Sequence, residues 1–208
     1  GTWHLVHYGS CAAGGFGLIV AEATAVSPEG RISPADTGLW NDDQVAAWRT
    51  VTDAVHKLGG KIAVQLGHAG RKASTEKWWP GFHGSVVPPE QGGWTPVGPT
   101  TAPADGKQYV GLPVTALDED GIAKVIDNFR SAAARAVEAG FDAVEIHSAH
   151  GYLLHQFYSP LSNTRADGWG GDFDGRVRLP LEVAKAVRDA IPDTMPLLAR
   201  LSVTDWRD

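Results

Sequence analysis

The sequence predicts an α/β protein in which parallel strands alternate with helices around one core. Four short apolar segments recur along the chain, and an amphipathic helical pattern separates each one from the next. The chain has 208 residues, of which 43% are hydrophobic and 20% charged, a composition typical of one folded domain. Strict alternation implies parallel strands joined by right-handed crossovers, so a doubly wound sheet and a (β/α) barrel are the two candidate architectures.

The first half of the chain contains two of the strands. Residues 17–23 form the first apolar segment, and residues 43–58 follow with apolar side chains at helical spacing. Two glycines end that helical pattern and precede the second strand, at residues 61–66. Residues 76–113 are rich in Gly, Pro and Trp and follow neither period. We expect this segment to be an irregular excursion over the surface.

The second half resumes the alternation. Thr115 and Asp118 resemble a capping box, and a long amphipathic helix is expected after them. Residues 141–147 and 196–202 are the third and fourth strands, and the helix between them is expected to have Pro180 in its first turn. No Gly-x-Gly-x-x-Gly motif begins any of these helices, which disfavours a Rossmann nucleotide site.

Charge and composition exclude several classes of partner. The chain has 18 basic and 24 acidic residues and a net charge of -6, without the basic surface that nucleic-acid binding requires. The longest apolar run, residues 17–21, is too short to span a bilayer. The single cysteine, Cys11, excludes an internal disulfide and is in keeping with a reducing compartment. We therefore expect a cytoplasmic protein with neither a nucleic-acid nor a membrane partner.

Each predicted strand carries a polar residue near its C-terminal end, and these residues are Glu22, Gln65, His147 and Arg200. In a parallel α/β fold these ends meet at one rim, where loops build the active site. Buried polar groups cost free energy unless they are hydrogen-bonded. The sequence therefore predicts a polar ligand at this rim.

The richest chemistry lies between residues 145 and 155. His147 ends a strand, and His150 and Tyr152 follow on its loop, so two imidazoles and a phenol are expected at one place. A metal site would need a third nearby ligand, and an ordinary core would satisfy each histidine with neighbouring carbonyls. In the third interpretation both imidazoles hold a carbonyl oxygen while Tyr152 donates a proton, which suits hydride addition to a conjugated C=C.

Two further side chains are candidates for binding a flat or anionic group. The amide of Gln65 is able to donate to and accept from the edge of a heterocycle. Arg200 ends an apolar strand and needs an acceptor, which an anionic ring or a phosphate would provide. Arg71 and Lys72, in contrast, also have a simple interpretation as solvated loop charges.

Three segments together resemble a known family. They are residues 22–31, residues 65–74 and residues 139–152, the last with the sequence AGFDAVEIHSAHGY, followed by SNTR at 162–165 and Gly-Gly at 170–171. They are similar to the old yellow enzymes, a family of NADH:flavin oxidoreductases, and within it to the bacterial NADPH dehydrogenase and xenobiotic reductase branch. The related dienoyl-CoA reductases, which add an iron-sulfur cluster, are a rival branch.

The resemblance implies an FMN-dependent ene-reductase. It implies a (β/α)8 TIM barrel with FMN at the C-terminal rim, reduced by NADPH or NADH and reoxidised by a small α,β-unsaturated carbonyl compound. By position, the matching cofactor-binding residues are Ala23, Gln65 and Arg200, and the catalytic and substrate-binding residues are His147, His150 and Tyr152, with Lys72 as an additional substrate-binding residue. A homo-oligomeric parent protein is compatible with the same resemblance.

The resemblance also implies that residues 1–208 form a partial flavin-binding barrel. We count four strands, which match the second to the fifth of eight, so the chain is expected to be an internal fragment that alone binds FMN poorly. Trp169 and Gly67 differ from the tyrosine and alanine that are common in the family. Two other functions stay open from the residues, namely a flavin-independent barrel lyase or hydrolase and a non-catalytic binding domain.

Overall fold

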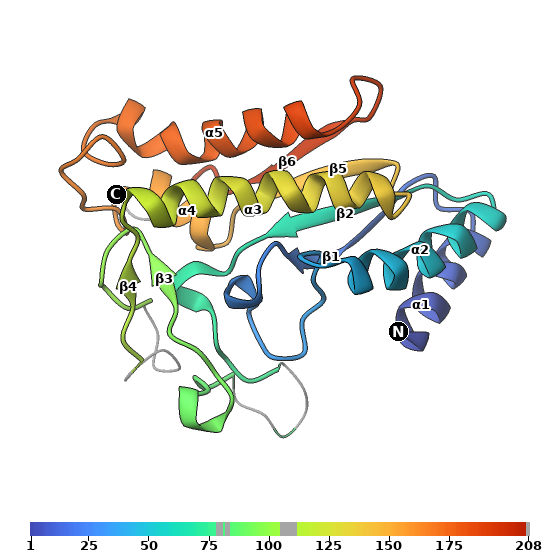
Figure 1. Cartoon of the computed structure of the whole chain (residues 1–208), viewed down its shortest axis with the longest axis horizontal. Helices are drawn as coiled ribbons and strands as arrows, with labels where there is room; N and C mark the ends of the chain where they lie inside the picture. Colours follow the sequence, from blue (N-terminus) through green and yellow to red (C-terminus); the bar gives the residue numbers. More distant parts are fainter. Residues whose placement is uncertain (78–80, 82–83, 105–111, 207–208) are drawn as a thin grey trace.

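Four parallel strands form the main sheet of the computed structural model, which describes residues 1–77, 81, 84–104 and 112–206. They are β1 (Ile19–Ala25), β2 (Ile62–Gly67), β5 (Ala143–Ser148) and β6 (Leu197–Leu201). Their spatial order, β1-β2-β5-β6, is also their order along the chain (Figure 1). Each predicted strand is therefore present, shifted by at most two residues.

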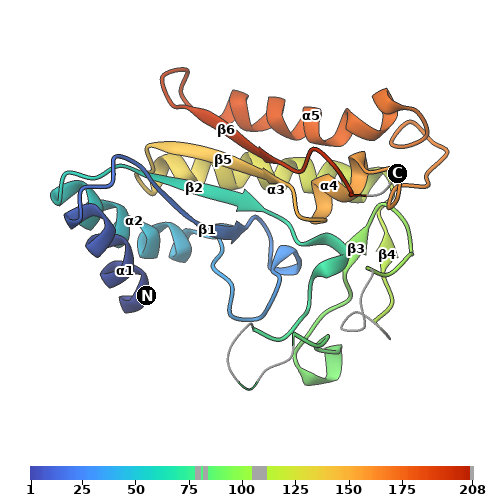
Figure 2. The same cartoon turned by 180° about the vertical axis from the view of Figure 1, so that it is seen from behind.

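The long helices all cover the same face of this sheet. They are α1 (Thr2–Ala13), α2 (Asp42–Lys57), α3 (Glu119–Glu138) and α5 (Phe173–Ala190). In Figure 2, seen from behind, the strands lie in front of α2 and α3. A doubly wound sheet has helices on both faces, whereas a (β/α) barrel has them only outside. The arrangement is that of the barrel.

The two faces of the strands differ in chemistry. Ile62, Val64 and Leu66 of β2 alternate toward the helices and are fully buried in one core with Phe129 of α3 and Val183 of α5. The residues between them point to the other face, because side chains in a strand alternate. The helix side of the sheet is thus the hydrophobic core, and the opposite face is left for the polar residues of the site.

The start of α3 differs from the prediction. Asp118 is its N-cap, with a carboxylate oxygen that accepts the backbone N–H of Gly121 at 2.8 Å. Thr115 instead lies in the short strand β4 (Thr115–Ala116), which pairs with β3 (Val97–Gly98). The predicted capping box was therefore wrong, because the acidic residue assigned to its third helical position is itself the cap.

The start of α5 also differs. Asp172 caps this helix through the backbone N–H of Gly175 at 2.9 Å, so the helix begins at Phe173 and Pro180 lies in its interior. Placing Pro180 in the first turn was wrong. Proline in a helix interior removes one backbone hydrogen bond, and the helix continues past Pro180 with Leu179, Val183 and Val187 buried in the core.

The described part of the segment at 76–113 contacts the loop that follows β1 through Trp94. It contains the 3-10 turn η3 (Pro89–Gln91) and the strand β3. The indole N–H of Trp94 donates to the carbonyl of Glu29 at 2.9 Å, and the Arg31 guanidinium stacks 4.6 Å from the Trp94 ring centre. Trp78 and Trp79 of the same segment fall outside the described residues.

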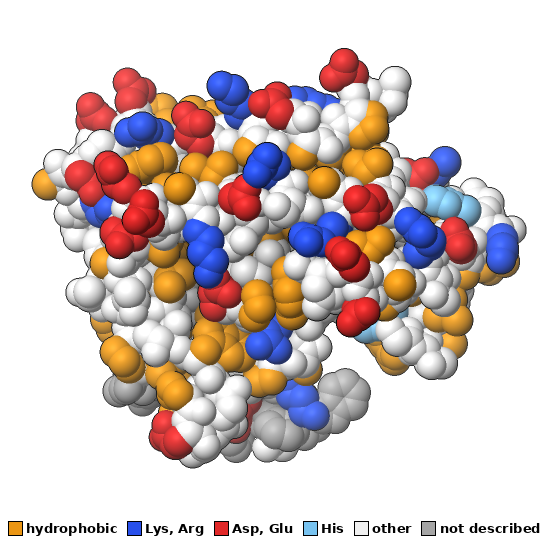
Figure 3. Space-filling model, viewed as in Figure 1, with side chains coloured by type: hydrophobic (Ala, Val, Ile, Leu, Met, Phe, Trp, Pro, Cys, Tyr) orange, Lys and Arg blue, Asp and Glu red, His pale blue; other side chains and the backbone are white. Residues whose placement is uncertain are grey.

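The outer surface of the helices is polar. Figure 3 shows Lys and Arg side chains interspersed with Asp and Glu over the face that α3 and α5 present. Within the part of the chain that the structure describes, no helix combines the length and the apolar character that crossing a membrane requires.

Candidate active site

Residues from all four strands line one cavity of about 430 Å³. The strand register places Ala23 of β1, Gln65 of β2 and Glu145 of β5 side by side, and His147 of β5 beside Arg200 of β6. The cavity is lined by all the predicted site residues except Lys72, namely Ala23, Gln65, His147, His150, Tyr152 and Arg200. Four separate segments of the sequence therefore meet at the predicted rim.

Gln65 has a fixed amide orientation. Its Nε2 lies 2.6 Å from Oε1 of Glu145, and only the amide N–H is able to donate in this pair because an ionised carboxylate only accepts. Gln65 is 7% exposed and lies on β2 between two neighbouring strands. The amide oxygen of Gln65 is then left as an acceptor for a ligand N–H.

The histidine pair is held in defined tautomers. Nδ1 of His147 accepts the backbone N–H of Ala149 at 3.2 Å, so the ring proton is on Nε2. That proton faces Nδ1 of His150, at 3.2 Å. His150 therefore carries its own proton on Nε2, where it is available to a ligand oxygen.

Both imidazoles are neutral at pH 7. Burial, with help from His150 and Arg200, lowers the pKa of His147 to about 4. Burial and the charges of Arg200 and Lys72 also lower the pKa of His150. The pair therefore offers neutral N–H donors across the physiological pH range.

Tyr152 and Lys72 lie beside the histidines. The Tyr152 ring meets His147 edge-on, with 5.0 Å between the ring centres. Nζ of Lys72 donates to the carbonyl of His150 at 2.8 Å and lies 5.9 Å from the Tyr152 ring centre. Lys72 thus contacts the backbone of His150 and does not line the cavity. Its predicted role in substrate binding stays a prediction.

Arg200 supplies a positive charge to the cavity. Its side chain is exposed on β6 and forms no hydrogen bond or ion pair with another residue of the described chain. A guanidinium in this setting is suited to a flat or anionic acceptor, because it presents several N–H groups in one plane.

Glu22 is not at a strand end, contrary to the prediction. It lies in the middle of β1, which continues to Ala25. Its carboxylate accepts the Tyr8 hydroxyl at 2.7 Å and pairs with Nε2 of His4 at 2.7 Å, both from α1. Glu22 lines the cavity, but its carboxylate oxygens are engaged by the helix.

Several residues near the site were not assigned a role from the sequence. They are Glu145, His155, Ser202 and Asp205. Glu145 had a signal, since it shares a strand face with His147. The other three lie on loops and on the short helix α4 (Leu153–Tyr158), which has no amphipathic pattern of its own. Among the residues that the structure describes, no group of three or more His, Cys, Asp or Glu is arranged to hold a metal ion.

The sequence profile of the NADH:flavin oxidoreductase / NADH oxidase family matches residues 1–208. The chain belongs to this family. It is 46% identical to an NADH:flavin oxidoreductase of Gibberella zeae over 98% of its length, and 44% identical to an NADPH dehydrogenase of Listeria innocua over 98%. These alignments cover 49% and 54% of the two relatives, so the chain spans about half of their length.

Solved structures of the family have the same fold. Morphinone reductase superimposes with a TM-score of 0.81 at 37% identity, over 97% of this chain and 53% of that one. An old yellow enzyme homologue from Zymomonas mobilis gives a TM-score of 0.79 at 35% identity, over 95% and 53%. The predicted resemblance and the predicted part of a TIM barrel are both confirmed.

Proposed function

We propose that the protein containing this chain is an FMN-dependent oxidoreductase that passes hydride from NAD(P)H to the C=C of an α,β-unsaturated carbonyl compound. The observation that carries the proposal is the pair of neutral imidazoles, His147 and His150, in the same cavity as the Arg200 guanidinium. This is the arrangement that a flat electron-rich ring with a carbonyl compound above it requires.

The residues present fit FMN. An isoalloxazine edge combines an imide N–H with carbonyl oxygens, and the Gln65 amide oxygen is oriented to accept from such an N–H. Arg200 would hold the pyrimidine side and stabilise negative charge that develops there on reduction. Ala23, on β1 beside Gln65, has a small side chain that leaves room for a flat ring.

The histidines would bind and polarise the substrate. The Nε2–H of His150 would donate to the carbonyl oxygen, and His147 would strengthen this donor through the hydrogen bond between the two rings. Charge that develops on this oxygen is then stabilised by preorganised neutral donors. Bound FMN supplies the hydride to the β-carbon of the C=C.

Tyr152 is placed to complete the reaction. Its ring packs against His147, on the side of the cavity where a bound enone would lie. The carbon next to the carbonyl becomes basic when the β-carbon accepts hydride, and the phenol O–H would supply its proton. The histidine pair would therefore act on the carbonyl oxygen, and Tyr152 on the carbon next to the carbonyl.

Names of relatives support this reaction class. Several curated relatives at 42–44% identity are NADPH dehydrogenases. One solved structure of morphinone reductase is a complex with tetrahydroNAD. These names favour a nicotinamide donor for this protein, with NADPH as the first to test.

An anaerobic titration of the complete polypeptide tests the proposal. NADPH should bleach the flavin absorbance, and 2-cyclohexenone should restore it. His147→Ala and His150→Ala should each slow the restoration by about 100-fold, because His150 is the donor to the oxyanion and His147 orients and polarises that donor. His7→Ala, on the exposed face of α1, is the matched control and should behave as wild type. A protein without flavin, or variants that restore the colour at the wild-type rate, would overturn the proposal.

A further inference from the structure

His150 has a backbone conformation that is unusual for a residue with a side chain. Its φ is 58°, in the left-handed region, and the next residue, Gly151, also has a positive φ of 71°. A Cβ in this region is crowded by the backbone, so the conformation persists only where the surroundings impose it. The position of the His150 imidazole in the cavity depends on this strained turn.

Three side chains impose the turn, each from a different part of the chain. The backbone N–H of His150 donates to Oγ of Ser202 at 3.0 Å, and the His150 carbonyl accepts Nζ of Lys72 at 2.8 Å. The next backbone N–H, that of Gly151, donates to Nδ1 of His155 at 2.8 Å. Every backbone polar group on either side of the His150 Cα is therefore fixed.

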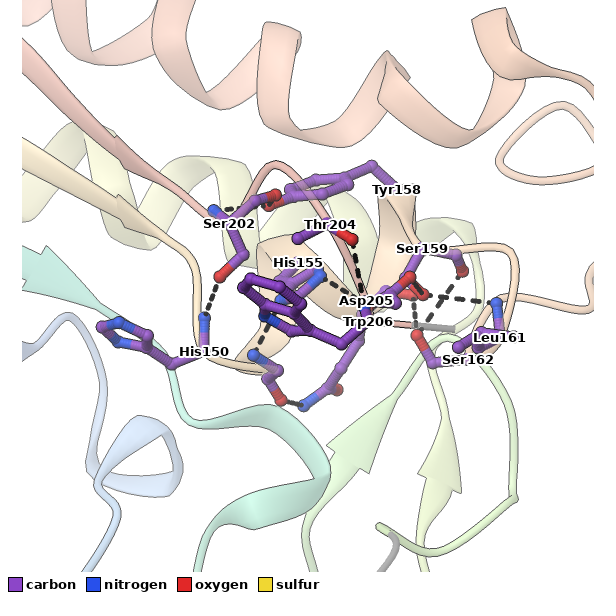
Figure 4. A network of polar contacts seen from close by, with 12 residues as sticks. His150, His155, Tyr158, Ser159, Leu161, Ser162, Ser202, Thr204, Asp205 and Trp206 are labelled. Carbon is purple, nitrogen blue, oxygen red and sulfur yellow. Dashed lines mark hydrogen bonds and ion pairs between the residues drawn. The ribbon is translucent and has the colours of Figure 1, made fainter. Parts of the chain in front are cut away.

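His155 is oriented by an acidic residue on the loop after β6. Since Nδ1 of His155 accepts a hydrogen bond, its proton is on Nε2, which lies 3.1 Å from Oδ1 of Asp205. The other oxygen of Asp205 accepts the Ser159 hydroxyl at 2.7 Å. Figure 4 shows Asp205 between His155 and Ser159, with Ser202 beside His150. The carboxylate thus fixes both the tautomer and the ring plane of His155.

Tyr158 of α4 holds the backbone of Ser202 in place. The Tyr158 hydroxyl donates toward the carbonyls of Ser148 and Ser202, at 2.7 and 2.9 Å, and accepts the Ser202 N–H at 3.2 Å. The Tyr158 ring also stacks on His155, with 4.7 Å between ring centres. Ser202 and His155, two of the three side chains that hold the His150 turn, therefore belong to one connected network that joins the ends of β5 and β6.

We propose that Asp205 and Ser202, on the loop after β6, are positioning residues that hold the His150 imidazole in its ligand-binding orientation. The proposal rests on the proposed function, in which His150 donates to the substrate carbonyl. Neither residue lines the cavity, so both act through His150. A hydrogen-bonding group displaced by a fraction of an ångström loses much of its effect on the reaction.

A double-mutant cycle separates positioning from general stabilisation. Asp205→Ala and Ser202→Ala in the complete polypeptide should each weaken 2-cyclohexenone binding to the oxidised enzyme by about tenfold. In a His150→Ala background the same changes should alter enone binding less than twofold. Asp193→Ala, an exposed aspartate before β6, is the matched control and should have no effect. Equal losses with and without His150 would overturn the proposal.

Amide hydrogen exchange gives a readout that needs neither flavin nor substrate. Asp205→Ala should accelerate exchange at the Gly151 amide, and Ser202→Ala should accelerate it at the His150 amide, each by at least about tenfold. Asp193→Ala should change neither. If the wild-type protein lacks flavin, the proposed function fails while these exchange rates still decide whether the network holds the turn. Unchanged exchange at both amides would refute the network.

Discussion

Replacing His68 with Asn is expected to reduce the sensitivity of the fold to acid. His68 follows β2, is 3% exposed, and its Nδ1 accepts the backbone N–H of Gly70 at 3.0 Å. Burial lowers the pKa of this imidazole from 6.5 to about 4. An Asn side-chain oxygen is able to take the place of Nδ1, so His68→Asn keeps the acceptor and removes the titrating group.

The sign and the size follow from proton linkage. Between pH 6.5 and pH 4 the unfolded chain binds a proton at His68 and the folded chain does not, so stability falls as the pH falls. Each pH unit in this window costs about 1.4 kcal/mol. From pH 7 to pH 5 the wild-type protein should lose about 2 kcal/mol at this residue, and the variant should not.

Urea unfolding at pH 7 and pH 5 measures the difference. The variant starts from a lower stability at pH 7, because Asn fills less of the site, and only its pH dependence is diagnostic. His147, whose pKa is also lowered to about 4, titrates in both proteins and cancels in the comparison. The exposed His7→Asn is the control. Equal losses of stability between pH 7 and pH 5 in wild type and His68→Asn would refute the reasoning.

Three further changes test the cap, the cavity wall and the cofactor site. Asp118→Ala should lower the free energy of unfolding by about 1 kcal/mol because α3 loses its N-cap, while Thr115→Ala should cost less, as urea titrations would show. Gly67→Ala should keep its flavin and its melting temperature, because the added Cβ would lie at an ordinary contact distance, 3.4 Å from His147 Cβ; loss of flavin in purified protein would contradict this. Arg200→Met should weaken FMN binding by at least about tenfold in a fluorescence titration, and an unchanged affinity would exclude the proposed contact.

Local patterns identified the regular elements well, and the errors had local causes. The helix at Asp42–Lys57 and the strands β2 and β5 follow from apolar periodicity and glycine stops, which are properties of neighbouring residues. The cap of α3 was misassigned because Thr115 and Asp118 both have side chains that are able to cap a helix. Pro180 was misplaced because α5 begins at Phe173, before its buried apolar residues start at Leu179. Helix α4 was missed because nearly all of its side chains are buried, which removes any amphipathic pattern.

The sequence by itself determined the α/β class, three of the four polar strand ends and, through three motifs, the family, because all of these depend on residue types at fixed spacings. The tertiary structure alone decided that the helices cover one face of the sheet, that Glu145 fixes the Gln65 amide, and that Asp205 reaches His155 across 50 residues of chain. Such contacts join segments that only the fold brings together, and the orientation of a side chain depends on its partners in space rather than on its neighbours in sequence.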